Sequence, residues 1–218
     1  MDFAAARHNM VENQLRTNRV IDPLVVEAMD AVPRERFLPK QMRGIAYVDE
    51  DIDLGGGRFL MEPLVLGRLL QSAEIRPTDV VLDVGCGTGY ATAVIARMAS
   101  TVVALESDPE AAAGAAAVLE ELGVVNAAVV SGPLAEGYPT QGPYDVIVIA
   151  GQVPEVPPGL CAQLADGGRL VAVICDDDTG VGRLTVVTRA GNTYGRRALF
   201  DGSTRRLAGF EKRPGFVF

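Results

Sequence analysis

The sequence has 218 residues, a formal net charge of −8, one histidine (His8) and three cysteines. The odd number and wide spacing of the cysteines argue against a disulfide framework or a zinc site, and a histidine-based hydrolase would have to use His8 near the N-terminus. The acidic balance disfavours non-specific nucleic-acid binding and no apolar run reaches the roughly 20 residues of a membrane helix, so we expect a cytoplasmic protein with no metal, nucleic-acid or membrane partner.

The first third of the chain predicts helices around a glycine-rich loop. Residues 6–31 are expected to form two helices, the second starting at Asp22-Pro23, because an Asp N-cap followed by Pro is typical of a helix start. Residues 34–61 are expected to be loop-like, with an acidic stretch before three consecutive glycines. Glu62-Pro63 then begins a helix in which leucines recur at helical spacing.

From residue 78 onward, short apolar runs alternate with helical segments, which implies right-handed βαβ units and a mostly parallel sheet. Three final apolar runs have no helices between them and are expected to pair antiparallel at one edge. The predicted strands are 80–84, 101–105, 127–130, 145–149, 169–174, 184–188, 195–200 and 216–218, and the predicted helices are 90–98, 109–122 and 157–164.

The segment Asp83-Val84-Gly85-Cys86-Gly87-Thr88-Gly89 follows the first of these strands and opens a helix. Its glycines allow the backbone to turn sharply and to approach a ligand closely, and the helix N-terminus offers free N–H groups. Glu106 ends the next strand, the place where a carboxylate accepts hydrogen bonds from ribose hydroxyls in a Rossmann-like fold. The pattern therefore predicts a nucleoside-containing cofactor.

Several ligands compete for this loop. A Walker loop needs Gly-Lys-Ser/Thr, which is not present, and a nicotinamide site favours a third glycine where this chain has Tyr90. A glycine turn that binds no ligand is the remaining alternative, which Asp83, Glu106 and the strand–helix alternation disfavour. The Asp-x-Gly-x-Gly-x-Gly form resembles motif I of the class I S-adenosylmethionine-dependent methyltransferases.

Further segments resemble the protein-L-isoaspartate O-methyltransferase family over roughly residues 6–175. They are MVENQLRTNRVIDPLVVEAMDAVPRERFLP (10–39), AYVDEDIDLGGG (46–57) and YDVIVIAG (144–151). The resemblance implies an α/β fold, namely a Rossmann-like, doubly wound, mostly parallel seven-stranded methyltransferase sheet with N-terminal helices and antiparallel C-terminal strands. It implies one methyltransferase domain over 1–218, composed of a helical and substrate-loop addition (1–77), a cofactor-binding core (78–175) and C-terminal strands (176–218).

The resemblance also implies an activity and a cofactor. Such enzymes transfer the methyl group of S-adenosylmethionine to the carboxylate of an isoaspartyl residue in a damaged protein or peptide, which leads to its repair. The glycine loop would surround the methionine portion, Asp83 would lie beneath it, Glu106 would hold the ribose and Ser107 would lie beside the adenine. The glycine-loop residues concerned are Gly85, Cys86, Gly87 and Gly89.

Two stretches depart from the family pattern. In the substrate loop, Phe59 and Met61 replace a Thr and a Ser, and Glu62 replaces a Gln. A thioether accepts hydrogen bonds only weakly and Glu62 would repel a carboxylate, whereas Arg58 would bind one. Met61 and Arg58 are therefore the candidate substrate-site residues, and packing of the apolar pair beneath the loop is the alternative.

The second departure is at Pro133-Leu134, where the family usually has an Asp that reads the adenine amino group. Pro133 supplies neither a carboxylate nor a backbone donor, so apolar contacts and neighbouring backbone would hold the adenine. The leading hypothesis is an isoaspartyl methyltransferase. A methyltransferase for another carboxylate acceptor and a non-catalytic cofactor-binding interaction protein remain alternatives, and the sequence leaves the oligomeric state open.

Overall fold

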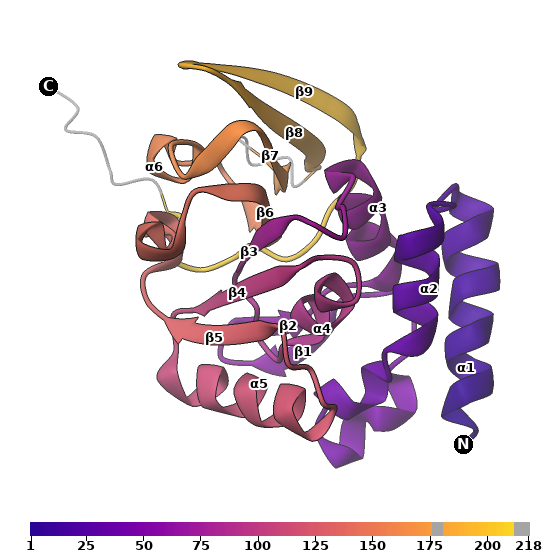
Figure 1. Cartoon of the computed structure of the whole chain (residues 1–218). Helices are drawn as coiled ribbons and strands as arrows, with labels where there is room; N and C mark the ends of the chain where they lie inside the picture. The colour runs from indigo at the N-terminus through magenta and orange to yellow at the C-terminus, as the bar shows by residue number, and fades with distance from the viewer. Residues whose placement is uncertain (176–180, 212–218) are drawn as a thin grey trace, which may run out of the picture.

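The computed structural model describes residues 1–175 and 181–211. A seven-stranded sheet lies at its centre (Figure 1), with the order β5-β4-β3-β6-β7-β8-β9. Strands β3 to β7 are parallel, whereas β8 pairs antiparallel with both β7 and β9, which confirms the expected doubly wound sheet. The strands are β3 Val80–Val84, β4 Thr101–Glu106, β5 Ala127–Ser131, β6 Tyr144–Val153, β7 Leu164–Ile174, β8 Arg183–Ala190 and β9 Thr193–Asp201.

Helices cover both faces of this sheet. Successive strand residues point to opposite sides, and because apolar residues occupy both sides, each face is buried beneath helices. Val81 belongs to the apolar cluster beneath the N-terminal helices, α3 and α4, whereas Leu82 belongs to the cluster beneath α6. Helix α1 continues into a π-helical turn (Val11–Leu15) and a 3-10 turn (Arg16–Asn18). The helices are α1 Phe3–Met10, α2 Pro23–Ala31, α3 Pro63–Ala73, α4 Tyr90–Ala96, α5 Pro109–Glu121 and α6 Pro158–Cys161.

Two sequence predictions were wrong in detail. Residues 34–61 are not simply a loop: they form 3-10 turns and an antiparallel hairpin of β1 (Ile52–Gly55) and β2 (Arg58–Leu60). Its strands are too short for period-2 alternation to be read, and positive φ angles at all three glycines close the turn. The helix expected over 157–164 ends at Cys161, because Leu164 already pairs with Tyr144 at the start of β7.

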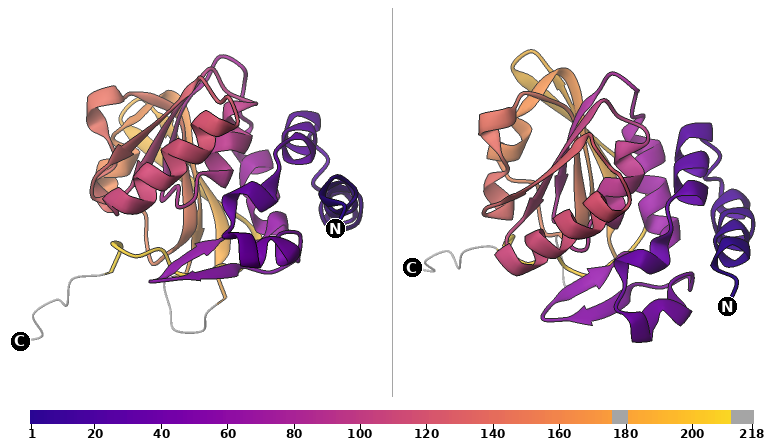
Figure 2. Two further views of the ribbon diagram at one scale, coloured as in Figure 1. Left: turned by 90° about the horizontal axis from the view of Figure 1, so that it is seen from below. Right: turned by 60° about the horizontal axis from the view of Figure 1, so that its bottom comes forward.

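The two predicted antiparallel strands 184–188 and 195–200 are confirmed as β8 and β9, while the predicted strand 216–218 lies outside the described residues. The hairpin β1–β2 projects beyond one end of the large sheet, next to the C-terminal segment that follows β9 (Figure 2). Asp51 joins the two, since its side chain accepts hydrogen bonds from the Thr204 hydroxyl and the Arg205 N–H, each at 2.8 Å.

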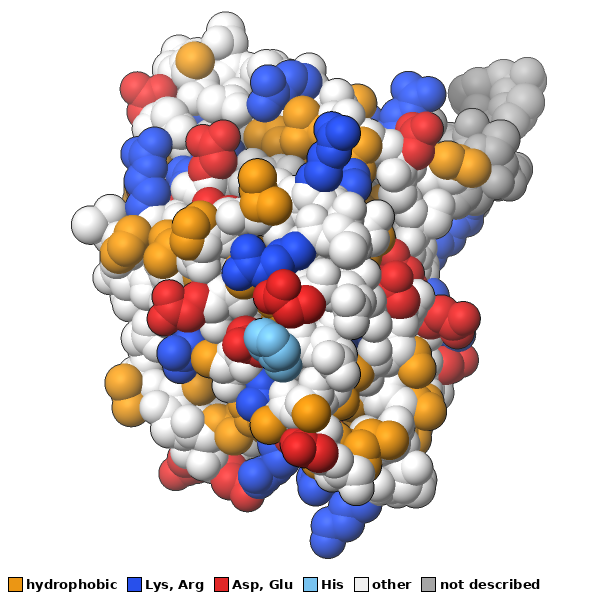
Figure 3. Space-filling view, turned by 90° about the vertical axis from the view of Figure 1, so that its right-hand side faces the viewer, with side chains coloured by type: hydrophobic (Ala, Val, Ile, Leu, Met, Phe, Trp, Pro, Cys, Tyr) orange, Lys and Arg blue, Asp and Glu red, His pale blue; other side chains and the backbone are white. Residues whose placement is uncertain are grey.

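On the face that the N-terminal helices form, basic and acidic side chains are interspersed with small apolar groups (Figure 3). This face therefore has mixed charge. No helix within residues 1–175 and 181–211 has the length and apolar character needed to cross a bilayer.

Candidate active site

A cavity of about 90 Å³ lies where β3 and β4 end at their carboxyl termini. This is the point at which the strand order reverses, because β4 continues the sheet on one side of β3 and β6 on the other, and it is where α/β sheets bind ligands. The lining residues come from the hairpin, the glycine loop, the carboxyl ends of β4 and β6, and the C-terminal segment. They are Gly56, Gly57, Arg58, Phe59, Gly85, Gly87, Glu106, Ser107, Leu134, Ala150, Leu207 and Ala208.

The glycine loop joins β3 to α4 and forms the floor of the cavity. Gly85 and Gly87 adopt φ angles of 80° and 54°, a region that residues with a Cβ rarely enter. Gly89 also has a positive φ angle, 89°, but it does not line the cavity, and a Cβ there would lie 3.3 Å from the Cβ of Ala115 in α5. Gly85 and Gly87 thus face the ligand space, whereas Gly89 allows α4 and α5 to pack closely.

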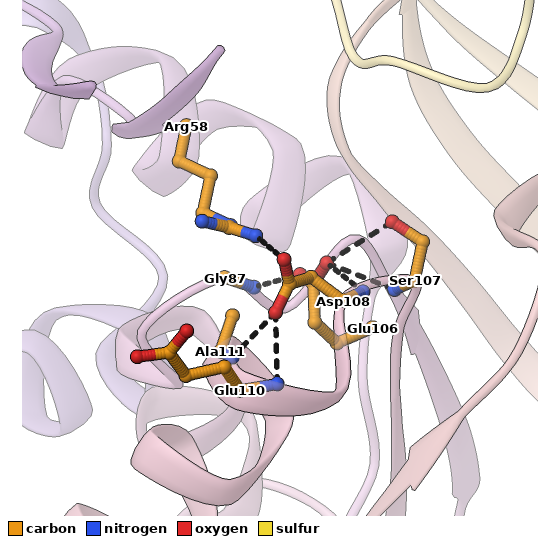
Figure 4. Close-up of polar contacts among 7 residues, drawn as sticks. All are labelled: Arg58, Gly87, Glu106, Ser107, Asp108, Glu110 and Ala111. Carbon is orange, nitrogen blue, oxygen red and sulfur yellow. Dashed lines mark hydrogen bonds and ion pairs between the residues drawn. The ribbon is translucent and has the colours of Figure 1, made fainter. Parts of the chain in front are cut away.

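Glu106 is held rigidly at the end of β4 with 6% of its surface exposed. Its Oε2 accepts a hydrogen bond from the Gly87 N–H at 3.0 Å, and its Oε1 accepts from the backbone N–H groups of Ser107 and Asp108 at 2.8 and 3.1 Å (Figure 4). The Ser107 hydroxyl also donates to Oε1 at 3.2 Å, so the remaining acceptor capacity lies on Oε2, which accepts only the Gly87 N–H among the described residues and has about two lone-pair sites. The carboxylate is therefore pre-oriented to accept hydrogen bonds from a ligand.

Asp83 lies beneath the glycine loop and is fully buried. The Thr92 hydroxyl donates to its Oδ2 at 2.6 Å, but its Oδ1 has no hydrogen-bond partner among the described residues. Burial, opposed by the Thr92 hydrogen bond and assisted by the charge of Glu106, raises the pKa of Asp83 to about 7. A buried acceptor without a partner is costly unless a donor fills the position, so Asp83 fits a cationic ligand group.

Arg58 extends from β2 to the opposite rim of the cavity, where it forms an ion pair with Asp108 (Figure 4). Asp108 is also the N-cap of α5 and accepts from the N–H groups of Glu110 and Ala111 at 2.8 and 3.0 Å. The Ala111 N–H and then Arg58 hold the pKa of Asp108 below its ordinary value. The ion pair therefore joins a charged hairpin residue to a fixed carboxylate next to Glu106.

The two apolar residues of the substrate loop lie in different places. Phe59 lines the cavity, and a Cβ on Gly151 would lie 3.4 Å from its ring carbon Cζ. Met61 is 5% exposed within the apolar core, and its backbone carbonyl accepts a hydrogen bond at 2.7 Å from the buried Arg34. The structure therefore brings Phe59, but not Met61, to the cavity.

Glu62 follows Met61 at the N-terminus of α3, close to other carboxylates. Burial first, and then the charges of Asp51 and Asp49, raise its pKa to about 7 against the opposing charge of Arg34. Asp51 accepts a hydrogen bond from the Glu62 N–H at 2.7 Å through Oδ1, while its Oδ2 holds Thr204 and Arg205. The replacement of the family Gln by Glu62 thus adds a carboxyl group where negative charge is already concentrated.

The remaining predicted residues divide between lining and supporting positions. Ser107 and Leu134 line the cavity, while Pro133 lies outside the lining and begins the turn that places Leu134. Cys86 is buried, and burial raises the pKa of its thiol, so it contributes backbone rather than a reactive thiolate.

Sequence reasoning missed the C-terminal contribution to the cavity. The N–H of Leu207 donates to the Gln152 carbonyl at 2.9 Å, and a Cβ on Gly85 would lie 2.8 Å from either Leu207 methyl carbon. Leu207 therefore packs directly on the glycine loop. No local pattern indicates this contact, because it depends on the return of the chain across β6 after β9. Ala150, by contrast, follows a predicted strand at the same sheet edge as Glu106.

Comparison with known proteins agrees with this geometry. The model of a family described as Protein-L-isoaspartate(D-aspartate) O-methyltransferase (PCMT) matches residues 6–197. The chain belongs to the protein-L-isoaspartate O-methyltransferase family. It is 41% identical over 187 residues to Protein-L-isoaspartate O-methyltransferase 1 of Rhodopseudomonas palustris (strain HaA2), covering 86% of this chain and 76% of that protein.

Other members of the family extend the comparison. The chain is 41% identical over 169 residues to Protein-L-isoaspartate O-methyltransferase of Koribacter versatilis (strain Ellin345), covering 78% of this chain and 76% of that protein. A solved protein-L-isoaspartate O-methyltransferase shares the fold with a TM-score of 0.81 at 24% identity, over 94% of this chain and 67% of that one. A family member from Plasmodium falciparum, solved with S-adenosyl-L-homocysteine, gives a TM-score of 0.77 at 21% identity over 93% and 98%.

Proposed function

We propose that the chain is an S-adenosylmethionine-dependent methyltransferase that esterifies the side-chain carboxylate of isoaspartyl residues in proteins or peptides. The observation that carries the proposal is that Gly85, Gly87 and Glu106 line one cavity, while the buried Asp83 at the end of β3, just before the glycine loop, has an Oδ1 without a partner among the described residues. Relatives that are 41% identical over most of the chain are named for this activity.

The residues present fit the proposed cofactor. The Asp83 Oδ1 is a buried acceptor without a partner among the described residues, and the amino group of the cofactor would supply a donor for it. Glu106 is oriented to accept from ribose hydroxyls, and Leu134 offers an apolar surface to the adenine beside Ser107. The cofactor, when bound, supplies an activated methyl group.

The chain's own residues then have to align the acceptor and exclude water. A carboxylate has an unperturbed pKa near about 4 and is already an ionised nucleophile at neutral pH, so the reaction requires no histidine base. Phe59 and Leu207 cover the cavity from the hairpin and the C-terminal segment and keep the transfer site dry. Of the candidate substrate-loop residues, Arg58 lines the cavity and pairs with Asp108, while Met61 supports the loop from the core.

One observation favours a second candidate, a methyltransferase for a different carboxylate acceptor. The loop side chain that faces the cavity is the apolar Phe59, where the family has a hydroxyl. An aromatic wall suits an acceptor whose carboxylate is carried by an apolar group, because burial of that group is favourable.

Incubation with methyl-labelled cofactor and an isoaspartyl peptide, against the same peptide with a normal aspartate, tests the proposal. We expect a base-labile methyl ester on the isoaspartyl peptide only. If neither peptide is esterified although the protein binds S-adenosylhomocysteine, the second candidate replaces the first. Complete lack of cofactor binding would contradict both and support the non-catalytic alternative.

A further inference from the structure

Two segments outside the cofactor-binding core cover the cavity, and we call them the cover: the hairpin β1–β2 and residues 204–208. Asp51, which precedes β1 directly, accepts hydrogen bonds from Thr204 and Arg205, and Asp53 of the hairpin forms a 2.8 Å ion pair with Arg205. One ion pair and two hydrogen bonds thus connect the hairpin side of the cover to residues 204–208.

The base and the tip of the hairpin are held differently. Ile52 and Leu60 at the base are 3% and 5% exposed and belong to the apolar core, which fixes the ends of the hairpin. The glycine tip, residues 55–57, is exposed and has positive φ angles throughout. The side-chain link from this end of the hairpin to the loop between β4 and α5 is the ion pair of Arg58 with Asp108 (Figure 4).

The cavity enclosed by these contacts is small. Its volume is about 90 Å³, whereas ligand pockets typically measure about 300–1,000 Å³. A cofactor that carries an adenosine and an amino acid is larger than this volume, and the cover bounds the cavity on one side. The hairpin tip is the part that moves most easily, because its glycines are exposed. On the Glu106 side it is restrained by the ion pair of Arg58 with Asp108, whose side chains are 38% and 39% exposed.

We propose that Asp108 is a positioning residue that, by pairing with Arg58, latches the hairpin tip over the ribose side of the cofactor cavity and slows cofactor exchange. Asp108 suits this task because the N-terminus of α5 fixes its carboxylate through two N–H groups. It follows Glu106 by two residues, so the latch closes next to the group proposed to hold the ribose. This inference rests on the proposed cofactor site, and it assigns Arg58 to the cofactor side of the cavity.

The test measures the dissociation rate of S-adenosylhomocysteine by stopped-flow fluorescence or surface plasmon resonance. Asp108→Asn keeps an N-cap acceptor and removes the charge, and Arg58→Gln removes the partner. We expect each variant to release the ligand about two- to fivefold faster, as for a half-exposed ion pair. The double variant is expected to be no faster than the faster single variant, because both changes break one interaction.

Two further readouts separate a latch from a general loss of structure. Raising salt from about 50 to about 500 mM is expected to speed release from the wild type but not from either variant, since salt screens the pair. Arg58→Lys is expected to restore part of the slow release. Asp22→Asn is the matched control, because Asp22 caps α2 with the same two-bond geometry ahead of a proline, and it should leave release unchanged.

Each outcome decides between the claims. Unchanged release in both single variants, or additive effects in the double variant, overturns the latch while the cofactor site stands. A higher acceptor KM with unchanged release would instead assign Arg58 to the acceptor carboxylate and also overturn the latch. A wild type that does not bind S-adenosylhomocysteine contradicts the proposed function itself.

Discussion

The cofactor side and the acceptor side of the cavity are built on different principles. On the cofactor side, backbone N–H groups fix the carboxylate of Glu106, and Asp83 is immobilised in full burial. On the acceptor side, Phe59 of the hairpin and Leu207 of the C-terminal segment form an apolar wall, and Asp51 links the chain around them through hydrogen bonds from Glu62 and Thr204. Under the proposed function, the ends of the sheet strands hold the cofactor, while short loops, whose residues depart from the family pattern, set the acceptor.

The largest expected effect separates the two loop residues Phe59 and Met61. Met61→Ser removes a core side chain and should lower the free energy of unfolding by about 3 kcal/mol, as for large-to-small core changes. Phe59→Thr changes a cavity wall and should cost less than half as much. Urea unfolding of both variants measures this, and equal losses would show that Phe59 and Met61 share one environment.

The next effect concerns Glu106. Glu106→Gln replaces a carboxylate that accepts from three backbone N–H groups, and it should weaken S-adenosylhomocysteine binding about 30-fold, within the range for hydrogen bonds to charged groups. Calorimetry on the variant and on Glu110→Gln, an exposed α5 control, provides the measurement. An affinity within a factor of two of the wild type would remove Glu106 from the cofactor side.

The raised pKa of Asp83 leads us to expect that cofactor affinity depends on pH. Because its pKa is raised to about 7 in the free protein, it is mostly neutral at pH 6 and must ionise to pair with a cationic amino group. Affinity should therefore rise about tenfold between pH 6 and pH 7.5, with proton release at the lower pH. Calorimetry in buffers of different ionisation enthalpy detects that release, and Asp83→Asn should bind weakly and without this slope.

The smallest expected effect is on the acceptor side, at Glu62. Its pKa rises from 4.5 to about 7 on folding, so the folded state holds the proton more tightly. Glu62 contributes fully to the free energy of unfolding below pH 4.5, where it is protonated in both states. That contribution is lost as pH rises through 7, because Glu62 then ionises within the folded protein. Glu62→Gln should therefore stabilise the protein at pH 8 by about 1 kcal/mol, allowing for partial exposure, and much less at pH 5.

Denaturant midpoints at both pH values check this prediction, with the exposed α2 residue changed in Glu27→Gln as the control. An equal gain at pH 5 and pH 8 would show that packing, rather than charge, makes Glu62 unfavourable. A gain confined to pH 8 would confirm that the acceptor side carries excess negative charge.

The contrast between the strand ends of the sheet and the short loops also explains which parts of the site the sequence could predict. The strand, glycine turn and helix around Gly85, and the placement of Glu106, follow from local pattern because the ends of parallel strands meet at one edge of the sheet. The hairpin β1–β2 escaped prediction because its strands are only four and three residues long. Leu207 and the orientation of Met61 depend on contacts with residues distant in the chain, which local periodicity does not encode.

The most direct test of the central claim is competitive methyl transfer in one tube that holds an isoaspartyl peptide and its normal aspartyl twin, with peptide masses read over time. A single ester is expected, on the isoaspartyl peptide, and its formation at limiting cofactor should be about 30-fold slower in Glu106→Gln. Equal esterification of both peptides, or none while the cofactor product is bound, would contradict the claim that this site acts on isoaspartyl carboxylates.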